Sequence, residues 1–231
     1  MNISLLQHTP EPELTVALAA RLCYSPIGID KLREKLSRAD ISSFLEKIMS
    51  LGHQSVLEHV SFTFGVEGIS RACSHQLVRH RIASYSQQSQ RYVEFKGDGV
   101  PLVIPESIAE NDRRKAVFNR AMQAASEAYR VLVDDGVPAE DARFVLPNAA
   151  ETKIIVTMNA RELLHFFELR CCERAQWEIR IMAIEMLRLI KPLAPTIFRD
   201  AGPGCVAGTC PEGAMTCGKT GSVRAFFKEM Q

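Results

Sequence analysis

The stretch that decides how this chain is interpreted is residues 79–89, RHRIASYSQQS, which Arg91 follows two positions later. Written as a pattern, it is Arg-His-Arg-x-x-Ser-x-x-x-x-Ser-x-Arg. Each guanidinium offers a rigid fork of donors that matches the oxygens of a phosphate group. A solvated helix end does not require so many cations and hydroxyls together. We therefore predict that this stretch binds an anion.

The segments on either side of this stretch predict a mixture of helices and strands. Ser70 is suited to cap a helix that runs to about Arg81, residues 84–90 predict a loop, and residues 91–95 predict a strand. The capping box of Ser107 and Glu110 predicts the start of a long helix. The remaining predicted strands are 60–66 and 153–159, and the remaining predicted helices begin near Pro12 or span 42–51, 139–146, 160–172 and 175–190.

Length and composition are those of an ordinary globular protein. The chain has 231 residues, of which 46% are hydrophobic and 24% are charged, enough for the core of one large domain or a compact two-lobed one. A net charge of +1 gives no global electrostatic case for nucleic acid or membrane binding, so any basic site is local. The start, MNISLLQHTPEPEL, is too short and polar for a signal peptide, and we expect a cytoplasmic protein.

The composition changes sharply after residue 199, where a segment rich in glycine, proline and cysteine begins. We predict one domain over residues 1–199, which contains the Arg-His-Arg run, and a tail over residues 200–231. The odd total of seven cysteines argues against a disulfide scaffold. Cys205, Cys210 and Cys217 lack the close pair typical of structural zinc sites. A flexible or redox-sensitive tail is therefore favoured over a metal-binding one, and we predict no metal.

Several other polar residues admit ordinary structural roles. His53 and His59 lack the i, i+4 spacing of a helical metal pair, which favours a ligand contact or a buried structural histidine. Taken alone, Arg143 and Arg161 are most simply surface ion-pair partners. Trp177 belongs to an apolar stripe typical of a helix core or a subunit interface.

Shorter stretches accompany the Arg-His-Arg run in a fixed order along the chain. They are GHQSVLEH at 52–59, Gln76, LPN at 146–148, NAR at 159–161, ELR ending at Arg170 and AQWEIR at 175–180. Together with residues 79–91 they resemble the flavin-dependent thymidylate synthases, and the resemblance covers roughly residues 1–198.

That resemblance implies an α+β fold with a central antiparallel sheet and long flanking helices. It implies a homotetramer whose active sites are shared between subunits. The implied reaction converts dUMP to dTMP, with 5,10-methylenetetrahydrofolate as the carbon donor. FAD, reduced by NADPH, supplies the hydride. Nucleic acids and membranes are not among the implied partners.

The resemblance also assigns residues to the two ligands. The residues implied to contact FAD are His53, Ser55, Arg79, His80, Arg81, Gln87, Asn159, Ala160, Arg161 and His165. Those implied to contact dUMP are Gln76, Arg79, Gln87, Gln88, Ser89, Gln90, Arg91, Arg143 and Arg170. The family often has Glu at the position of Gln87 and Asn at that of His165. A glutamine side chain can hydrogen-bond a ligand but cannot act as a base.

The chemistry of the reaction suggests how two of these residues act. Uracil C5 is a weak carbon nucleophile, so the enzyme must either add a cysteine to C6 or polarise the N3/O4 edge. No cysteine occurs in residues 79–91, and we predict that no enzyme cysteine serves as nucleophile. Arg170 is a permanent cation suited to stabilise charge on the uracil edge. Ser89 is assigned a positioning or polarising contact.

Two alternatives are kept beside this interpretation. The first is a flavin-dependent methyl transfer to another uracil, for instance in RNA. The second is a nucleic-acid-binding module that uses residues 79–91 for phosphates and the cysteine tail as a metal knuckle. The near-neutral charge counts against the second alternative, which also gives no reason for NAR at 159–161 or for AQWEIR at 175–180.

Overall fold

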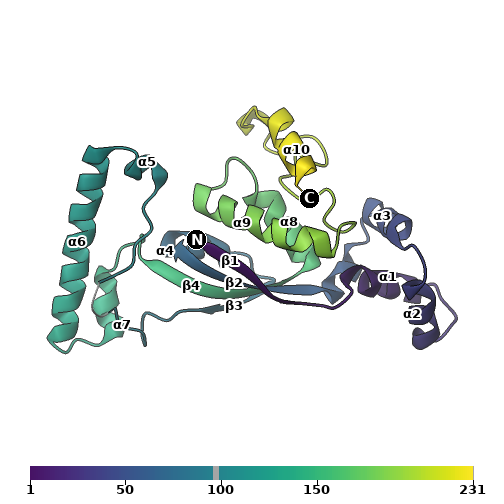
Figure 1. Cartoon of the computed structure of the whole chain (residues 1–231), viewed down its shortest axis with the longest axis horizontal. Helices are drawn as coiled ribbons and strands as arrows, with labels where there is room; N and C mark the ends of the chain where they lie inside the picture. Colours follow the sequence, from purple (N-terminus) through teal and green to yellow (C-terminus); the bar gives the residue numbers. More distant parts are fainter. Residues whose placement is uncertain (96–98, 231) are drawn as a thin grey trace. The chain divides into compact units, whose positions relative to one another are not determined.

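The computed structural model describes residues 1–95 and 99–230 (Figure 1). In that part of the chain the strands are β1 Asn2–His8, β2 Ser61–Ser70, β3 Ala83–Gln87 and β4 Glu151–Asn159. The α-helices are α1 Pro12–Leu22, α2 Ile29–Ser37, α3 Ser42–Ser50, α4 Arg71–Leu77, α5 Glu106–Ala109, α6 Asp112–Asp134, α7 Ala139–Ala142, α8 Ala160–Arg170, α9 Trp177–Ile190 and α10 Thr220–Glu229. Short 3₁₀ helices are η1 Gln54–His59, η2 Arg143–Val145, η3 Lys191–Leu193 and η4 Gly213–Met215.

The four strands form one sheet in the order β1-β2-β4-β3. The register of the β2–β4 pair shows that these strands are antiparallel. At one end the Ala160 N–H donates to the Val60 carbonyl, and at the other the Arg71 N–H donates to the Ala150 carbonyl. The predicted α+β class with an antiparallel sheet is therefore confirmed.

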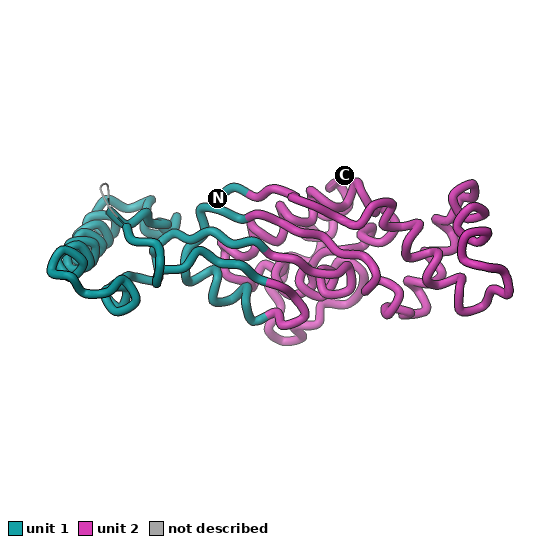
Figure 2. The backbone as a smooth tube through the Cα atoms, turned by 90° about the horizontal axis from the view of Figure 1, so that it is seen from below, with its two compact units in different colours: residues 1–2, 66–79, 85–155 teal, residues 3–65, 80–84, 156–231 magenta. Residues whose placement is uncertain are grey.

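The chain divides into two compact units, which Figure 2 shows in different colours. Unit 1 comprises residues 1–2, 66–79 and 85–155, and unit 2 comprises residues 3–65, 80–84 and 156–231. Each strand contributes residues to both units. The division also passes through the Arg-His-Arg run, because Arg79 belongs to unit 1 and His80 to unit 2.

The core of unit 2 is aromatic. Helices α8 and α9 pack side by side (Figure 1), and α8 buries Phe166 and Phe167. The alternation along β2 buries Phe62 and Phe64, and the Phe62 ring meets the edge of Phe198 at 5.6 Å between centroids. Each such side chain contributes about 1.5–3 kcal/mol through burial. This packing fixes the start of α8, where β4 passes directly into the helix.

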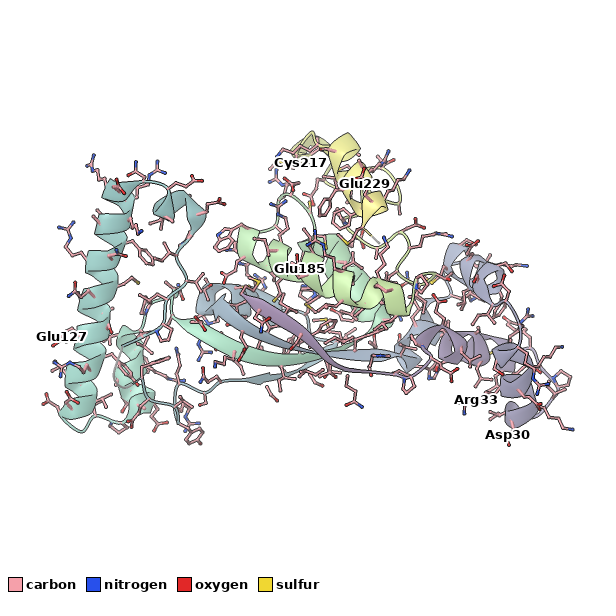
Figure 3. All side chains as sticks on the ribbon, in the orientation of Figure 1. Asp30, Arg33, Glu127, Glu185, Cys217 and Glu229 are labelled. Carbon is pink, nitrogen blue, oxygen red and sulfur yellow. The ribbon has the colours of Figure 1, made fainter. Side chains whose placement is uncertain are left out.

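The long helix of unit 1 begins later than predicted. Its N-cap is Asn111, whose Oδ1 accepts from the Arg114 N–H, whereas Ser107 lies within the separate helix α5. The predicted capping box at Ser107 is therefore wrong, because the side chain that caps α6 is that of Asn111, and α5 has Pro105 at its N-cap without a side-chain cap. On the exposed face of α6, Arg130 pairs with Glu127, which Figure 3 labels.

The segment after the Arg-His-Arg run also differs from the prediction. Residues 83–87 form strand β3 instead of a loop, and residues 91–95 form no strand. β3 lies at an edge of the sheet beside β4, so hydrogen bonding to a neighbouring strand outweighs its polar composition. Strand β1 and helix α2 were not predicted at all.

The C-terminal segment is folded over residues 220–229, where α10 buries Val223 and Phe227. Gly202, at φ +146°, leaves room for the Phe227 ring, since a Cβ there would lie 2.9 Å from the ring. Lys191 Nζ donates to the Phe227 carbonyl at 3.1 Å. The expectation of a flexible tail is wrong for this helix, because apolar residues at helical spacing give it a buried face. None of the described helices is both long and apolar enough to cross a membrane.

Candidate active site

A cleft of about 390 Å³ in unit 2 collects several of the residues predicted to contact flavin. Asn159, Arg161 and His165 line it, at the corner where β4 becomes α8. Asn159 caps the helix, since its Oδ1 accepts from the Glu162 N–H at 2.8 Å. Arg161 pairs with Glu58 at 2.5 Å on the cleft wall. The end of a strand thus positions three candidate side chains around one cleft.

The other candidate flavin residues of unit 2 lie next to residues that line this cleft. His53 and Ser55 are exposed on either side of Gln54, and Arg81 is exposed beside Ile82. Gln54 and Ile82 both line the cleft. Ala160 is buried at the first position of α8, so only its backbone is suited to a ligand contact.

His80 lies at the centre of a buried hydrogen-bonded chain in unit 2. Its Nδ1 is 3.1 Å from Glu162 Oε1, and its Nε2 is 3.0 Å from Arg170 Nε. His80 and Glu162 are 5% and 6% exposed. The structure thus brings two predicted site residues, His80 and Arg170, into direct contact, and adds a carboxylate that was not predicted.

The protonation states in this chain follow from its surroundings. Burial and the neighbouring Arg170 and His165 lower the pKa of His80 to about 4, so the ring is neutral at pH 7. Burial raises the pKa of Glu162, and His165 opposes that rise. A guanidinium only donates, so Nε2 of His80 accepts from Arg170. The proton of the neutral ring is then on Nδ1, which donates to Glu162.

This lowered pKa predicts a loss of stability in mild acid. Unfolded His80 binds its proton as the pH falls through about 6.5, whereas folded His80 does so only near pH 4. The free energy of unfolding should therefore decrease by about 3 kcal/mol between pH 7 and pH 4 because of this residue. Urea unfolding of the wild type and of His80→Gln across this range, at one protein concentration, measures it. Parallel pH dependences for the two proteins would contradict the assignment.

In unit 1 the predicted substrate residues surround the end of β3. The Gln87 amide donates to Ser74 Oγ at 2.9 Å and to Thr152 Oγ1 at 3.2 Å, which holds the side chain as a donor. Ser89 Oγ accepts from the Arg91 N–H at 3.1 Å. The hydroxyls around Gln87 give it neutral partners, consistent with an amide rather than a carboxylate at this position.

Two arginines of unit 1 form a cationic site that lacks an anion among the described residues. Arg71 donates through Nη2 to the Gln88 carbonyl at 3.3 Å, while its buried Nε has no hydrogen-bond partner. Burial and the charge of nearby Arg143 lower the pKa of Arg71. The buried Nε2 of Gln90 is also without a partner. Buried donors without acceptors are costly, so these two nitrogens could bind a ligand that supplies oxygens.

Two of the remaining candidates, Arg91 and Arg143, share a partner in Glu140. Arg91 pairs with Glu140 at 2.8 Å, and Arg143 Nε donates to the Glu140 carbonyl at 3.0 Å. Gln76 lies on α4 in unit 1, and Arg79 is exposed just after that helix. Arg170 belongs to unit 2, so its grouping with the substrate residues of unit 1 stays a prediction.

The cysteines are all free thiols. Burial raises the pKa of Cys205, and the nearby Cys210, Cys172 and Cys217 raise it further. Even so, no set of three or more His, Cys, Asp or Glu side chains in residues 1–95 and 99–230 is placed to hold a metal ion. The expectation that the protein binds no metal stays a prediction.

Two residues of the candidate site were missed by sequence reasoning. Arg71 is the first residue of α4, where a single arginine is usually an exposed surface residue. Glu162 is in the first turn of α8, where acidic residues are common for electrostatic reasons. The sequence did contain a signal for Arg71. Arg71, His75 and Arg79 are spaced i, i+4 and i+8, so they share one face of a helix with a residue already assigned to the site.

Comparison with known proteins covers most of the chain. Residues 4–196 match the family model described as "Thymidylate synthase complementing protein". A flavin-dependent thymidylate synthase of Geobacter sulfurreducens is 75% identical over 230 residues, which cover 100% of this chain and 99% of that protein. One from Clostridium tetani is 49% identical over 243 residues, covering 98% and 97% of the two chains. One from Pyrococcus horikoshii is 47% identical over 219 residues, covering 92% and 90%.

Proposed function

The chain belongs to the thymidylate synthase complementing protein family, and on that premise we propose that it is a flavin-dependent enzyme that converts dUMP to dTMP. The observation that carries the proposal is the 75% identity, over the full chain, to a flavin-dependent thymidylate synthase. Neither the nucleic-acid-binding alternative nor methylation of another uracil is favoured by these relatives. FAD in its reduced form, when bound, would supply the hydride that completes the methyl group.

The cleft of unit 2 suits the flavin ring. Ile82 and Leu164 offer apolar surface, and Gln54, Asn159 and His165 offer hydrogen-bonding groups along the same lining. A flavin ring has apolar faces and a polar edge, so this mixture matches it. We assign the FAD pyrophosphate to the exposed cation of Arg81, which belongs to unit 2 as the cleft does. The FAD contact of Arg79, in unit 1, stays a prediction.

The cationic site of unit 1 suits the phosphate of dUMP. Arg71 and Arg143 supply two adjacent charges, and the buried Nε of Arg71 and Nε2 of Gln90 supply donors that await acceptors. A phosphate group carries several oxygens and two negative charges, so it satisfies both requirements at once. Ser89 and Gln88 then lie beside the same ligand and position its uracil.

The finer features of the reaction are part of the same proposal. We assign 5,10-methylenetetrahydrofolate as carbon donor and NADPH as reductant, with Arg170 as the group that activates uracil and without an enzyme cysteine as nucleophile. Cys171 supports this last point, because burial raises the pKa of its thiol and disfavours the thiolate. We also propose a homotetramer with shared active sites. The boundary near residue 199 and the cytoplasmic location stay predictions.

The visible absorption spectrum of the purified protein tests this function. We expect oxidised-flavin bands, either as purified or after adding FAD, and a shift of these bands when dUMP is added. A shift would place the nucleotide against the flavin ring. Failure to take up FAD would contradict the proposal and return the nucleic-acid-binding alternative to consideration.

A further inference from the structure

We propose that Glu162 is a positioning residue, which fixes the tautomer and orientation of His80 and through it the guanidinium of Arg170. The inference rests on the proposed function at one point, the role of Arg170 in activating uracil. Its geometric part concerns only unit 2, where all three residues lie.

The first step is that the hydrogen-bonded chain has one consistent set of proton positions. Arg170 Nε carries a hydrogen at every accessible pH and points it at His80 Nε2, 3.0 Å away. His80 must therefore keep Nε2 unprotonated and carry its proton on Nδ1. Glu162 Oε1, 3.1 Å from Nδ1, is the acceptor for that proton. Without it, the Nδ1 hydrogen is buried with no acceptor, and the ring loses the contact that keeps Nε2 aimed at Arg170.

The second step is that the chain is held rigidly. The His80 ring meets Phe166 edge-on at 4.9 Å between centroids, and His165 at 6.0 Å. Glu162 is fixed at its backbone, where Asn159 Oδ1 accepts its N–H. Burying the carboxylate of Glu162, which is 6% exposed, costs free energy unless it is hydrogen-bonded. The bond to His80 offsets that cost. Asn159 thus holds Glu162, Glu162 holds His80, and His80 holds Arg170.

The third step connects this geometry to the reaction. A bond to Nε fixes the plane of the guanidinium, and hence the directions of its two terminal nitrogens. A donor aimed at developing charge is effective only when it is held in the productive direction before the reaction. Misplacement of such a group by about 1 Å costs roughly a hundredfold in rate. Glu162 therefore acts on kcat without touching substrate.

Two variants of Glu162 separate positioning from simple structural support. Glu162→Leu removes the acceptor, and we expect kcat to fall about a hundredfold with the KM for dUMP nearly unchanged. Because Glu162 also lines the cleft assigned to flavin, these assays are run with FAD saturating. Glu162→Gln can still accept from Nδ1, so it should restore most of the activity. Glu185→Gln is the matched control: Glu185, labelled in Figure 3, is half-exposed on α9 and pairs with Arg188. Equal losses in Glu162→Leu and Glu162→Gln would overturn the proposal.

The tautomer of His80 can be measured by NMR, independently of any enzyme assay. In protein labelled with ¹⁵N-histidine, long-range ¹H–¹⁵N spectra distinguish a ring protonated on Nδ1 from one protonated on Nε2. We expect the Nδ1–H form in the wild type and in Glu162→Gln. An Nε2–H form in the wild type would refute the proposal, even if Glu162→Leu failed to fold.

A double variant distinguishes failure of the inference from failure of the proposed function. Lysine at position 170 keeps the charge but has no Nε bond to His80, so adding Glu162→Leu to Arg170→Lys should lower kcat no further. A further hundredfold loss would show that Glu162 acts by another route. Full activity of Arg170→Lys and Arg170→Ala would instead refute the role of Arg170, and the measured tautomer would still decide whether Glu162 orients His80.

Discussion

Replacing Arg170 with alanine should lower kcat for dTMP formation by about a hundred- to a thousandfold, while FAD remains bound. The size of this loss is that of removing one donor aimed at developing charge. The structure supports the role, because His80 holds the guanidinium of Arg170 through Nε. Single-turnover formation of dTMP, measured beside the flavin absorbance, separates the chemical step from cofactor binding.

The matched control for this experiment is Arg188→Ala. Arg188 lies on α9 and pairs with Glu185 on the protein surface, so its loss should leave turnover unchanged. Wild-type turnover in Arg170→Ala would show that uracil is activated by another group. Loss of FAD in the same variant would instead assign Arg170 to cofactor binding.

Replacing Arg71 with methionine should raise the KM for dUMP roughly ten- to a hundredfold. A hydrogen bond between charged groups contributes about 1.5–3 kcal/mol, which corresponds to this range of affinity. Methionine keeps much of the side-chain volume, so the packing of α4 should survive. Steady-state kinetics over a range of dUMP concentrations, with FAD saturating, measure the effect. Arg120→Met, at an exposed position of α6, is the matched control.

Although Arg71→Met should bind dUMP more weakly, the ligand-free variant should be more stable than the ligand-free wild type. Without a ligand, the charges of Arg71 and Arg143 repel each other in a partly buried site, so removing one should raise the melting temperature of the free protein. Adding dUMP should then stabilise the wild type and have little effect on Arg71→Met. An unchanged response to dUMP in the variant would exclude Arg71 from the phosphate site.

Much of the fold could be predicted where periodicity and caps agree. The start of α4 at Ser70, strand β4, and helices α8 and α9 were all predicted within a few residues. β1 and β3 were not predicted, because they are edge strands whose stability depends on pairing with β2 and β4. Such pairing joins residues far apart in sequence, and local composition does not reveal it.

The site was only partly predictable for a related reason. The density of cations and hydroxyls in residues 79–91 predicts an anion site from the sequence alone. The roles of Arg71 and Glu162 depend on burial instead, since each residue type is ordinary at a helix start. Only the fold shows that Arg71 Nε lacks a partner and that Glu162 faces His80.

The hydrogen-bonded chain of Glu162, His80 and Arg170 also constrains where a proton can go. Forming dTMP replaces the hydrogen on uracil C5 with a methyl group, so one proton must leave the ring in every turnover. Histidine is the usual acceptor near neutral pH, but His80 has a pKa of about 4 and its Nε2 lone pair faces Arg170. The released proton must therefore pass to water or to a different side chain. The site must then contain a route by which that proton reaches solvent.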